Sequence, residues 1–272
     1  NDLAVYNQKH EPQYQLADFL VHIRVLQSKG FYQRCTKLIE KAKALAIELG
    51  DHLKLLELLN LEGLNHPGGI NPNNAEDIKK QQLGVYKMLE IEADFEALYK
   101  RTYQINSRTG YTNFDQEAID AFDEIMVLPL LSKDKMPVTF KAKRQYINIH
   151  YFYARGKGHG KDMHYWILKA KDLFESNPQL IKQHAVNYAT TLLNLQSSFL
   201  GQNQYGQAFE TIELLRSFYP KNQLKKHERL TYIIEYASLH HEIITYNKMG
   251  DFEKAVQEIS RLEHFLNKHE QE

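Results

Sequence analysis

The 272-residue chain has few of the residues that cross-link a fold or bias its charge. It has one cysteine, Cys35, so no disulfide bond can form within the chain. Lysine and arginine together number 34, as do aspartate and glutamate, so the basic excess that attracts nucleic acid is missing. No apolar run approaches the roughly 18 residues that a membrane-spanning helix needs. We therefore expect no nucleic-acid partner and no membrane insertion.

Proline and glycine are also scarce, with 7 and 13 copies, and they are clustered. Between the clusters, apolar residues recur every three or four positions, which is typical of amphipathic helices, and no segment has the pattern of a strand. We predict an all-α protein of about ten antiparallel helices in stacked hairpins. The expected helices cover residues 15–28, 31–49, 53–64, 74–106 (as two helices or one bent helix), 115–127, 138–155, 161–176, 180–200, 205–219, 224–249 and 251–268. Asp51 and Asn74 are expected N-caps, and Pro220 is an expected helix break.

One pattern of spacing recurs at four of the turns between helices. A turn residue is followed by an aromatic residue in three of the copies, then by a residue at the closest approach of two helices, and then by an isoleucine. The turn residues are Gly30, Gly158, Asn203 and Gly250. The residues at the close approach are Cys35, Met163, Ala208 and Ala255, and the isoleucines are Ile39, Ile167, Ile212 and Ile259. Cys35 is therefore predicted to be a buried packing residue and not a nucleophile.

This order of turn residue, aromatic residue, alanine and aliphatic residue resembles the second half of a tetratricopeptide repeat. The match is best at residues 203–208 (NQYGQA) and 250–255 (GDFEKA). The spacing of 45 and 47 residues between the last three copies exceeds the family's period of about 34, so we expect longer helices. The resemblance implies one TPR-like α-α superhelix, or solenoid, over residues 1–272. Residues 1–64 would form the first pairs, 65–137 divergent pairs and 138–272 C-terminal TPR-like pairs.

The resemblance also implies a groove for a partner. In tetratricopeptide arrays, the first helix of each pair lines the concave surface on which the partner lies. In that register the groove residues are Arg24, Gln27, Gln145, Asn148, Arg155, Thr190, Ser197, His240, Asn247 and Lys248. The set offers amides, hydroxyl groups and cations but no acid, which suits a protein segment or an extended peptide.

No group of residues points to catalysis, a metal or another cofactor. The glycine-rich run at residues 156–161 lacks the spacing of a phosphate-binding loop and is expected to be a turn. His240 and His241 are not followed by the second histidine of a zinc-protease helix. We therefore expect neither a cofactor nor a metal, although an enzyme that uses His240 or His241 is a remaining alternative.

Charge is balanced over the chain but not along it. Residues 90–124 carry nine acids and three bases, whereas residues 141–182 carry nine bases and three acids. The two stretches form either opposed functional patches or solvated faces that complement each other.

The leading functional hypothesis is a non-catalytic scaffold that binds a protein or peptide in its groove. The alternative is a peptide-sensing regulatory domain that controls an effector domain outside this sequence. Because the first residue is Asn1, we expect a longer protein, and cytoplasmic location is the default for a chain without disulfides. The partner, the pathway and the oligomeric state stay open.

Overall fold

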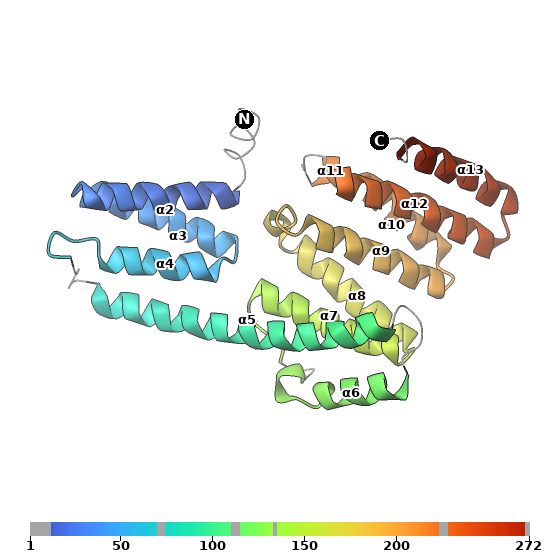
Figure 1. The fold of residues 1–272 in the computed structure, drawn as a ribbon, viewed down its shortest axis with the longest axis horizontal. Helices are drawn as coiled ribbons and strands as arrows, with labels where there is room; N and C mark the ends of the chain where they lie inside the picture. Colours follow the sequence, from blue (N-terminus) through green and yellow to red (C-terminus); the bar gives the residue numbers. More distant parts are fainter. Residues whose placement is uncertain (1–11, 70–73, 110–114, 133–134, 223–227, 270–272) are drawn as a thin grey trace. The chain divides into compact units, whose positions relative to one another are not determined.

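A computed structural model of the chain describes residues 12–69, 74–109, 115–132, 135–222 and 228–269. These residues form twelve α-helices and two 3-10 helices, and no strand occurs among them (Figure 1). The expected all-α fold is confirmed. Within the same ranges, no helix combines the length and the apolar character needed to cross a membrane.

The chain divides into two compact units. The first unit comprises residues 1–97 and 136–143, and the second comprises residues 98–135 and 144–272. The boundaries fall inside two helices, so each of these helices contributes to both units. The division at residues 64 and 137 that the repeat pattern suggested stays a prediction.

The first unit is built from α2 (Pro12–Ser28), α3 (Tyr32–Glu48), α4 (His52–Gly63) and the first part of α5 (Ala75–Thr109). Helices α2, α3 and α4 all contact one another around a core that includes Leu16, Ile23, Ile39 and Leu58. Cys35 is fully buried in this core, with its Sγ 3.7 Å from the carbonyl oxygen of Ile23. Burial raises the pKa of this thiol, and the predicted packing role of Cys35 is confirmed.

Helix α5 is one continuous helix of 35 residues, so the two-helix alternative is wrong. Glu76 and Asp77 in its first turn and Arg108 in its last turn match the helix dipole. The predicted cap Asn74 is also wrong, because its side-chain oxygen accepts no hydrogen bond from the described residues. In contrast, Asp51 caps α4 as expected, since its carboxylate accepts the Lys54 amide at 3.1 Å.

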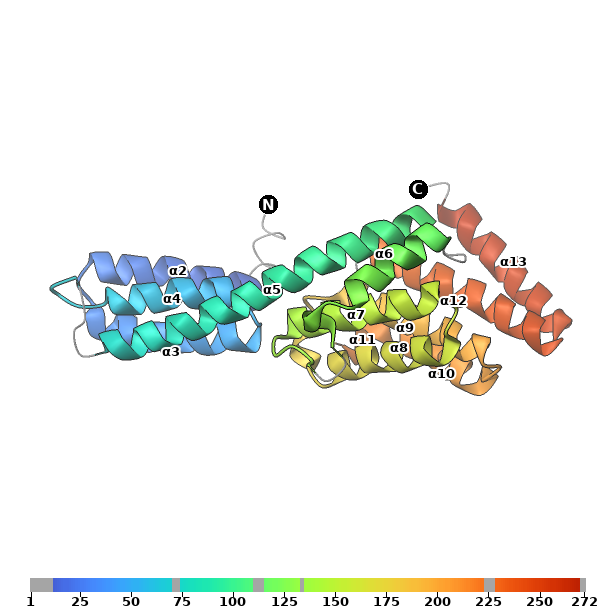
Figure 2. The ribbon, with the colours of Figure 1, turned by 90° about the horizontal axis from the view of Figure 1, so that it is seen from below.

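The second unit contains the rest of α5 and a series of helical hairpins. Its other elements are α6 (Gln116–Met126), η1 (Pro129–Leu131), most of α7 (Phe140–Gly156), α8 (Gly160–Glu175), η2 (Pro178–Leu180), α9 (Ala185–Gly201), α10 (Tyr205–Arg216), α11 (Phe218–Lys221), α12 (Glu228–Met249) and α13 (Phe252–His269). Contacts join α8 to α9, α9 to α10, α9 and α10 to α12, and α12 to α13. Figure 2 shows α12 and α13 side by side as an antiparallel pair. This packing of each hairpin on the next is consistent with a helical solenoid.

The four aligned turn residues share one backbone geometry. All have a positive φ, of 73° at Gly30, 69° at Gly158, 58° at Asn203 and 78° at Gly250. At each turn the amide of this residue bonds to a carbonyl three residues back, and the next amide bonds to a carbonyl five residues back. These two bonds define the Schellman motif, which ends a helix with a residue in the left-handed region. Gly50 (φ 63°) makes the same bonds between α3 and α4, a fifth copy that the spacing did not reveal.

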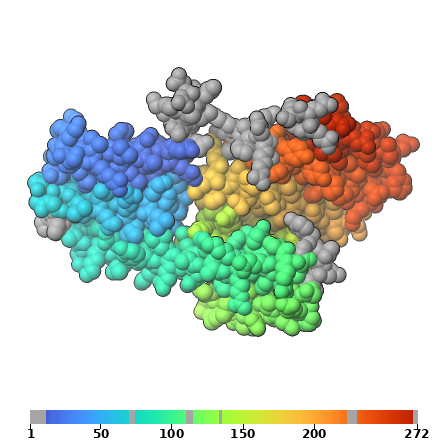
Figure 3. Space-filling view, viewed as in Figure 1, coloured from blue at the N-terminus to red at the C-terminus, as the bar shows by residue number. Residues whose placement is uncertain are grey.

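The residues that follow each turn are buried where another helix covers them. Ile39, Ile167 and Ile212 are almost fully buried, as the repeat pattern predicts. Ile259 of α13 is instead 41% exposed, and Phe252 beside it is more exposed still. The difference arises because no described helix follows α13, which lies at the margin of the second unit (Figure 3, red).

Two further expectations need correction. Pro220 does not break a helix but lies inside the four-residue α11. Proline is tolerated there because the backbone N–H groups in the first turn of a helix have no hydrogen-bond partner within the helix, so the N–H that proline lacks is not needed. The break falls earlier, where α10 ends at Arg216. Helix α9 begins at Ala185 and not at residue 180, because Pro178 and Leu180 belong to a separate 3-10 turn. The short α11 accounts for part of the excess over the expected ten helices.

Candidate functional site

The ten predicted groove residues are divided between the two units. Arg24 and Gln27 lie on α2 in the first unit, and the other eight lie in the second. Arg24 forms an ion pair with Glu57 of α4, and Gln27 donates a 2.7 Å hydrogen bond to the carbonyl oxygen of Leu61. Both side chains therefore tie α2 to α4.

The groove face of α7 is covered by the chain itself. Gln145 is only 4% exposed, and Arg155 donates a hydrogen bond to the side-chain oxygen of Asn106 on α5. Between them, Phe152 stacks on Tyr99 of α5, with ring centroids 6.1 Å apart. Asn148 shares this face and is half-buried. Residues 98–109 of α5 thus cover part of the α7 surface that the repeat register assigned to a partner.

Helices α9 and α12 keep their predicted groove residues exposed. Thr190 and Ser197 lie on α9, which carries no charged residue, and His240, Asn247 and Lys248 lie on α12. The two helices contact each other within the second unit. Five of the ten predicted residues therefore lie on two neighbouring helices and are accessible to a partner.

Helix α12 adds an aromatic ladder to this face, formed by Tyr232, Tyr236 and His240. The three rings are four residues apart and stack in order, with centroid distances of 6.1 and 5.9 Å and interplanar angles of 6° and 8°. Both tyrosines are 37% exposed, and His240 is exposed as well. Exposed aromatic rings that are already ordered can bind a partner at little entropic cost.

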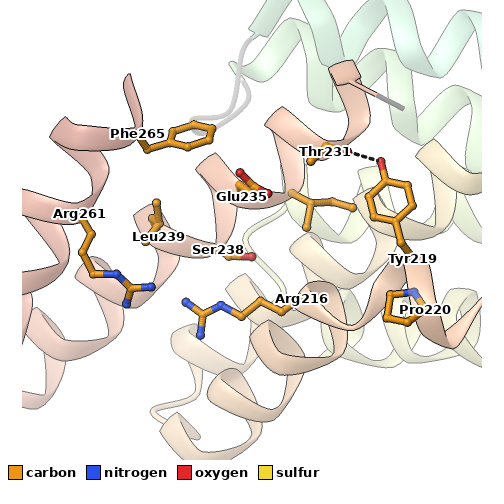
Figure 4. A pocket seen from close by; sticks show the side chains of 10 residues that line it. Arg216, Tyr219, Pro220, Thr231, Glu235, Ser238, Leu239, Arg261 and Phe265 are labelled. Carbon is orange, nitrogen blue, oxygen red and sulfur yellow. Dashed lines mark hydrogen bonds between the residues drawn. The ribbon is translucent and has the colours of Figure 1, made fainter. Parts of the chain in front are cut away.

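A pocket of about 480 Å³ adjoins the ladder among α10, α11, α12 and α13 (Figure 4). The ring of Phe265 in its wall lies 5.2 Å from that of Tyr232, so the pocket and the ladder are continuous. The lining residues are Arg216, Tyr219, Pro220, Thr231, Ile234, Glu235, Ser238, Leu239, Arg261 and Phe265. We call this space the α12 pocket.

The two arginines of the α12 pocket already have acidic partners. Arg216 pairs with Glu213 at 2.7 Å and with the buried carboxylate of Glu242, and Arg261 pairs with Glu258 at 2.7 Å. Burial lowers the pKa of Arg216, but the hydrogen bonds that its guanidinium donates to Glu242 and Glu213 outweigh that effect and raise the pKa. The pocket is therefore not a strong anion site, even though Figure 4 shows both guanidinium groups directed into the space between them.

One polar group in the α12 pocket is left unsatisfied. Ser238 is 2% exposed, and its hydroxyl group has no hydrogen-bond partner among the described residues. Ile234, Leu239 and Phe265 supply apolar wall around it. An apolar side chain that carries one hydrogen-bonding group fits such a pocket best.

The acidic and basic stretches meet in ion pairs. Lys141 pairs with Glu96 at 2.5 Å within the first unit, and Lys157 pairs with Asp123 at 2.8 Å within the second. Hydrogen bonds from Lys157 and from the Tyr153 hydroxyl hold the pKa of Asp123 below its usual value. These contacts favour the interpretation of the two stretches as complementary faces.

The histidines do not form a metal site within the described ranges, where no group of three or more His, Cys, Asp or Glu side chains could hold an ion. His241 is largely buried, and burial together with the neighbouring His240 lowers its pKa to about 4, so it is neutral at pH 7. The glycine-rich run at residues 156–161 contains the positive-φ turn at Gly158 and the start of α8.

The repeat register missed the two tyrosines of the ladder. A signal for them is present in the sequence, since Tyr232, Tyr236 and His240 recur every four residues and therefore lie along one face of a helix. The α12 pocket had no such signal, because its walls come from four different helices and their packing is not visible in any local pattern.

Comparisons with known proteins add no relative. No protein-family model matches the chain, and a search of curated proteins finds no significant match.

Proposed function

We propose that this chain is a divergent tetratricopeptide-like repeat protein that binds a protein segment or extended peptide without catalysing a reaction. The binding surface is the α9–α12 face, defined by Thr190 and Ser197 on α9 and by the aromatic ladder on α12. The shared Schellman turns and the contacts between successive hairpins support the repeat assignment.

The ladder is the observation that carries the proposal. Three aromatic rings stack in parallel along one side of α12, and each keeps part of its surface open to solvent, where a partner can contact it. Helix α9 contacts α12, and the hydroxyl groups of its Thr190 and Ser197 are exposed and can accept hydrogen bonds from a peptide backbone. The α12 pocket, which begins at Phe265, can take one anchoring side chain of the same peptide.

Selection from a library of random twelve-residue peptides tests the proposal. A selected peptide, labelled with a fluorophore, is titrated with the wild-type chain and with the double variant Tyr236→Ala, His240→Ala. We expect the double variant to bind at least about tenfold more weakly, because hot-spot aromatic residues contribute about 2 kcal/mol or more each.

Tyr86→Ala is the matched control, since Tyr86 is also an exposed tyrosine but lies on α5 in the first unit. It should leave affinity unchanged. Equal affinity of the wild type and the double variant for every selected peptide would refute the α9–α12 face as the binding surface.

A second candidate function, a peptide-sensing regulatory domain, is favoured by one observation. Helix α5 covers the groove face of α7 with residues 98–109 and continues without a break into the first unit. A ligand that changes this contact would alter the packing of α5, the helix that also contributes to the first unit. Hydrogen exchange measured with and without a bound peptide tests this, because a sensor should change protection at residues 98–109 whereas a passive scaffold should not.

A further inference from the structure

The two arginines of the α12 pocket are held by more carboxylates than they can neutralise. Arg216 contacts Glu213 at 2.7 Å and also the carboxylate of Glu242, which is 5% exposed. Arg261 donates hydrogen bonds to both oxygens of Glu258, at 2.9 and 2.7 Å. Three carboxylates thus surround two guanidinium groups, and one negative charge is left over.

Glu235 adds a second unbalanced negative charge to the α12 pocket. Its side chain lines the pocket, is exposed, and forms no ion pair or hydrogen bond with any described residue. Among the described residues, the lining and the carboxylates that hold its arginines therefore carry two more negative than positive charges. Such an excess attracts a cation, and water screens the attraction less beside a protein wall than in bulk solution.

The hydroxyl group of Ser238 is free to bind the charged end of a ligand. Ser238 lines the α12 pocket three residues after Glu235, on the same face of α12, and is only 2% exposed (Figure 4). Its hydroxyl group has no hydrogen-bond partner among the described residues. A hydroxyl group both donates and accepts, so by itself it does not select a charge. The excess of carboxylates makes that selection.

The apolar side of the α12 pocket suits an alkyl stem. Ile234, Leu239 and Phe265 form this wall. Lysine and arginine side chains pack their stems on such surfaces while the charged end reaches polar groups. We infer that the α12 pocket binds a lysine or arginine side chain, whose charged end donates a hydrogen bond to Ser238 and is attracted by Glu235. This inference rests on the proposed function, because the peptide on the α9–α12 face supplies the side chain.

The probe n-butylammonium, a lysine side chain without its backbone, tests the α12 pocket with no peptide present. The full ¹⁵N-labelled chain is titrated at constant ionic strength, and the backbone amide signal of Ser238, identified with Ser238→Ala, is followed by NMR. The uncharged n-butanol and the anionic butyrate serve as comparison probes. We expect n-butylammonium to saturate the shift with a Kd of about 1–10 mM, at least about fivefold below that of either comparison probe. An equal or lower Kd for n-butanol or butyrate would overturn the inference, as would the absence of a saturable shift with every probe.

Glu235→Gln removes the negative charge and keeps the size of the side chain. It should raise the Kd of n-butylammonium about threefold and leave that of n-butanol unchanged. Glu253→Gln is the matched control, since Glu253 is also an exposed glutamate of the second unit but does not line the α12 pocket. It should change neither Kd. Equal effects of the two variants would indicate a general surface-charge effect and overturn the assignment to this pocket.

Selected peptides test the same contact in a complete ligand. Each lysine or arginine of a peptide is changed to methionine, which keeps an apolar stem and removes the charge. At one position we expect this change to weaken binding about tenfold for the wild type but only about threefold for Glu235→Gln, because the variant has already lost one attracting charge. The residue at that position shows whether the pocket holds lysine or arginine, and either supports the inference.

The outcomes separate this inference from the proposed function. Peptides that bind with no lysine or arginine coupled to Glu235 overturn the inference and leave the proposed function standing. If no peptide binds at all, the proposed function fails, and the n-butylammonium titration alone decides whether the α12 pocket takes a cation.

Discussion

Alanine at Gly50 should destabilise the first unit, whereas alanine at Gly84 should stabilise it. Gly50 ends α3 with a φ of 63°, in the left-handed region that alanine adopts only with strain. Gly84 lies in the interior of α5, where alanine is the best helix former. A Cβ at either position meets no atom within 4 Å, so steric contacts cannot account for a difference.

The magnitudes follow from the backbone alone. The left-handed conformation costs an alanine about 1–2 kcal/mol, of which about 0.4–1 kcal/mol is regained because the unfolded chain loses freedom. Gly50→Ala should therefore lower the free energy of unfolding by about 1 kcal/mol. Gly84→Ala should raise it by about 0.5–1 kcal/mol, since both the helix propensity and the unfolded-state effect act in the same direction.

Urea unfolding followed by circular dichroism at 222 nm measures both effects. Both glycines belong to the first unit, so they report on the same packed helices. We expect the midpoint to fall for Gly50→Ala and to rise for Gly84→Ala at an unchanged m-value. A midpoint that rises for both variants would refute the assignment of the Gly50 turn to the left-handed conformation.

Three more changes have defined outcomes in the second unit. Asn203→Ala should lower the free energy of unfolding in urea by about 1–2 kcal/mol, because alanine tolerates the φ of 58° poorly and cannot accept the hydrogen bond from the Tyr205 hydroxyl. Asn203→Gly should lower it less, since glycine adopts this φ without strain. A larger loss for glycine than for alanine would contradict the left-handed turn. The free energy of unfolding should fall by about 2 kcal/mol from pH 7 to pH 5 because of His241. The pKa of this imidazole is about 4 in the folded chain and about 6.5 in the unfolded chain, so the unfolded chain binds the proton first as the pH falls. His241→Gln should show a smaller loss over this range, and an equal loss would argue against a buried neutral imidazole. Arg144→Met should raise the thermal midpoint by an amount equivalent to about 1 kcal/mol, because an unpaired charge need no longer be desolvated, and a lower midpoint would indicate a structural partner for this cation.

Much of the fold could be read from local sequence because its turns are local. The turns at Gly30, Gly158, Asn203 and Gly250 were predicted from a glycine or asparagine at the end of a helix, which in three of the four copies is followed five residues later by a small side chain. These features depend on φ preference and on hydrogen bonds within six residues. Pro220 was misjudged because the effect of a proline depends on its position in a helical turn, which the sequence pattern did not define.

The candidate site was less predictable, since accessibility depends on what packs over each face. Gln145 of α7 and Thr190 of α9 occupy equivalent positions in the repeat register, but Gln145 is buried and Thr190 is exposed. Helix α5 covers the face of α7 and leaves that of α9 open. No local pattern in α7 reports a helix that begins some sixty residues earlier in the sequence.

The sequence by itself determined the helical class, most turns, the packing role of Cys35 and the absence of a large net charge, since each depends on composition or on neighbours within two helical turns. Only the tertiary structure decided which polar side chains remain accessible, that Ser238 and Arg144 are buried without partners, and that Phe265 joins the aromatic ladder to the α12 pocket. Burial and pairing are properties of residues far apart in the chain, and they arise only when the helices pack.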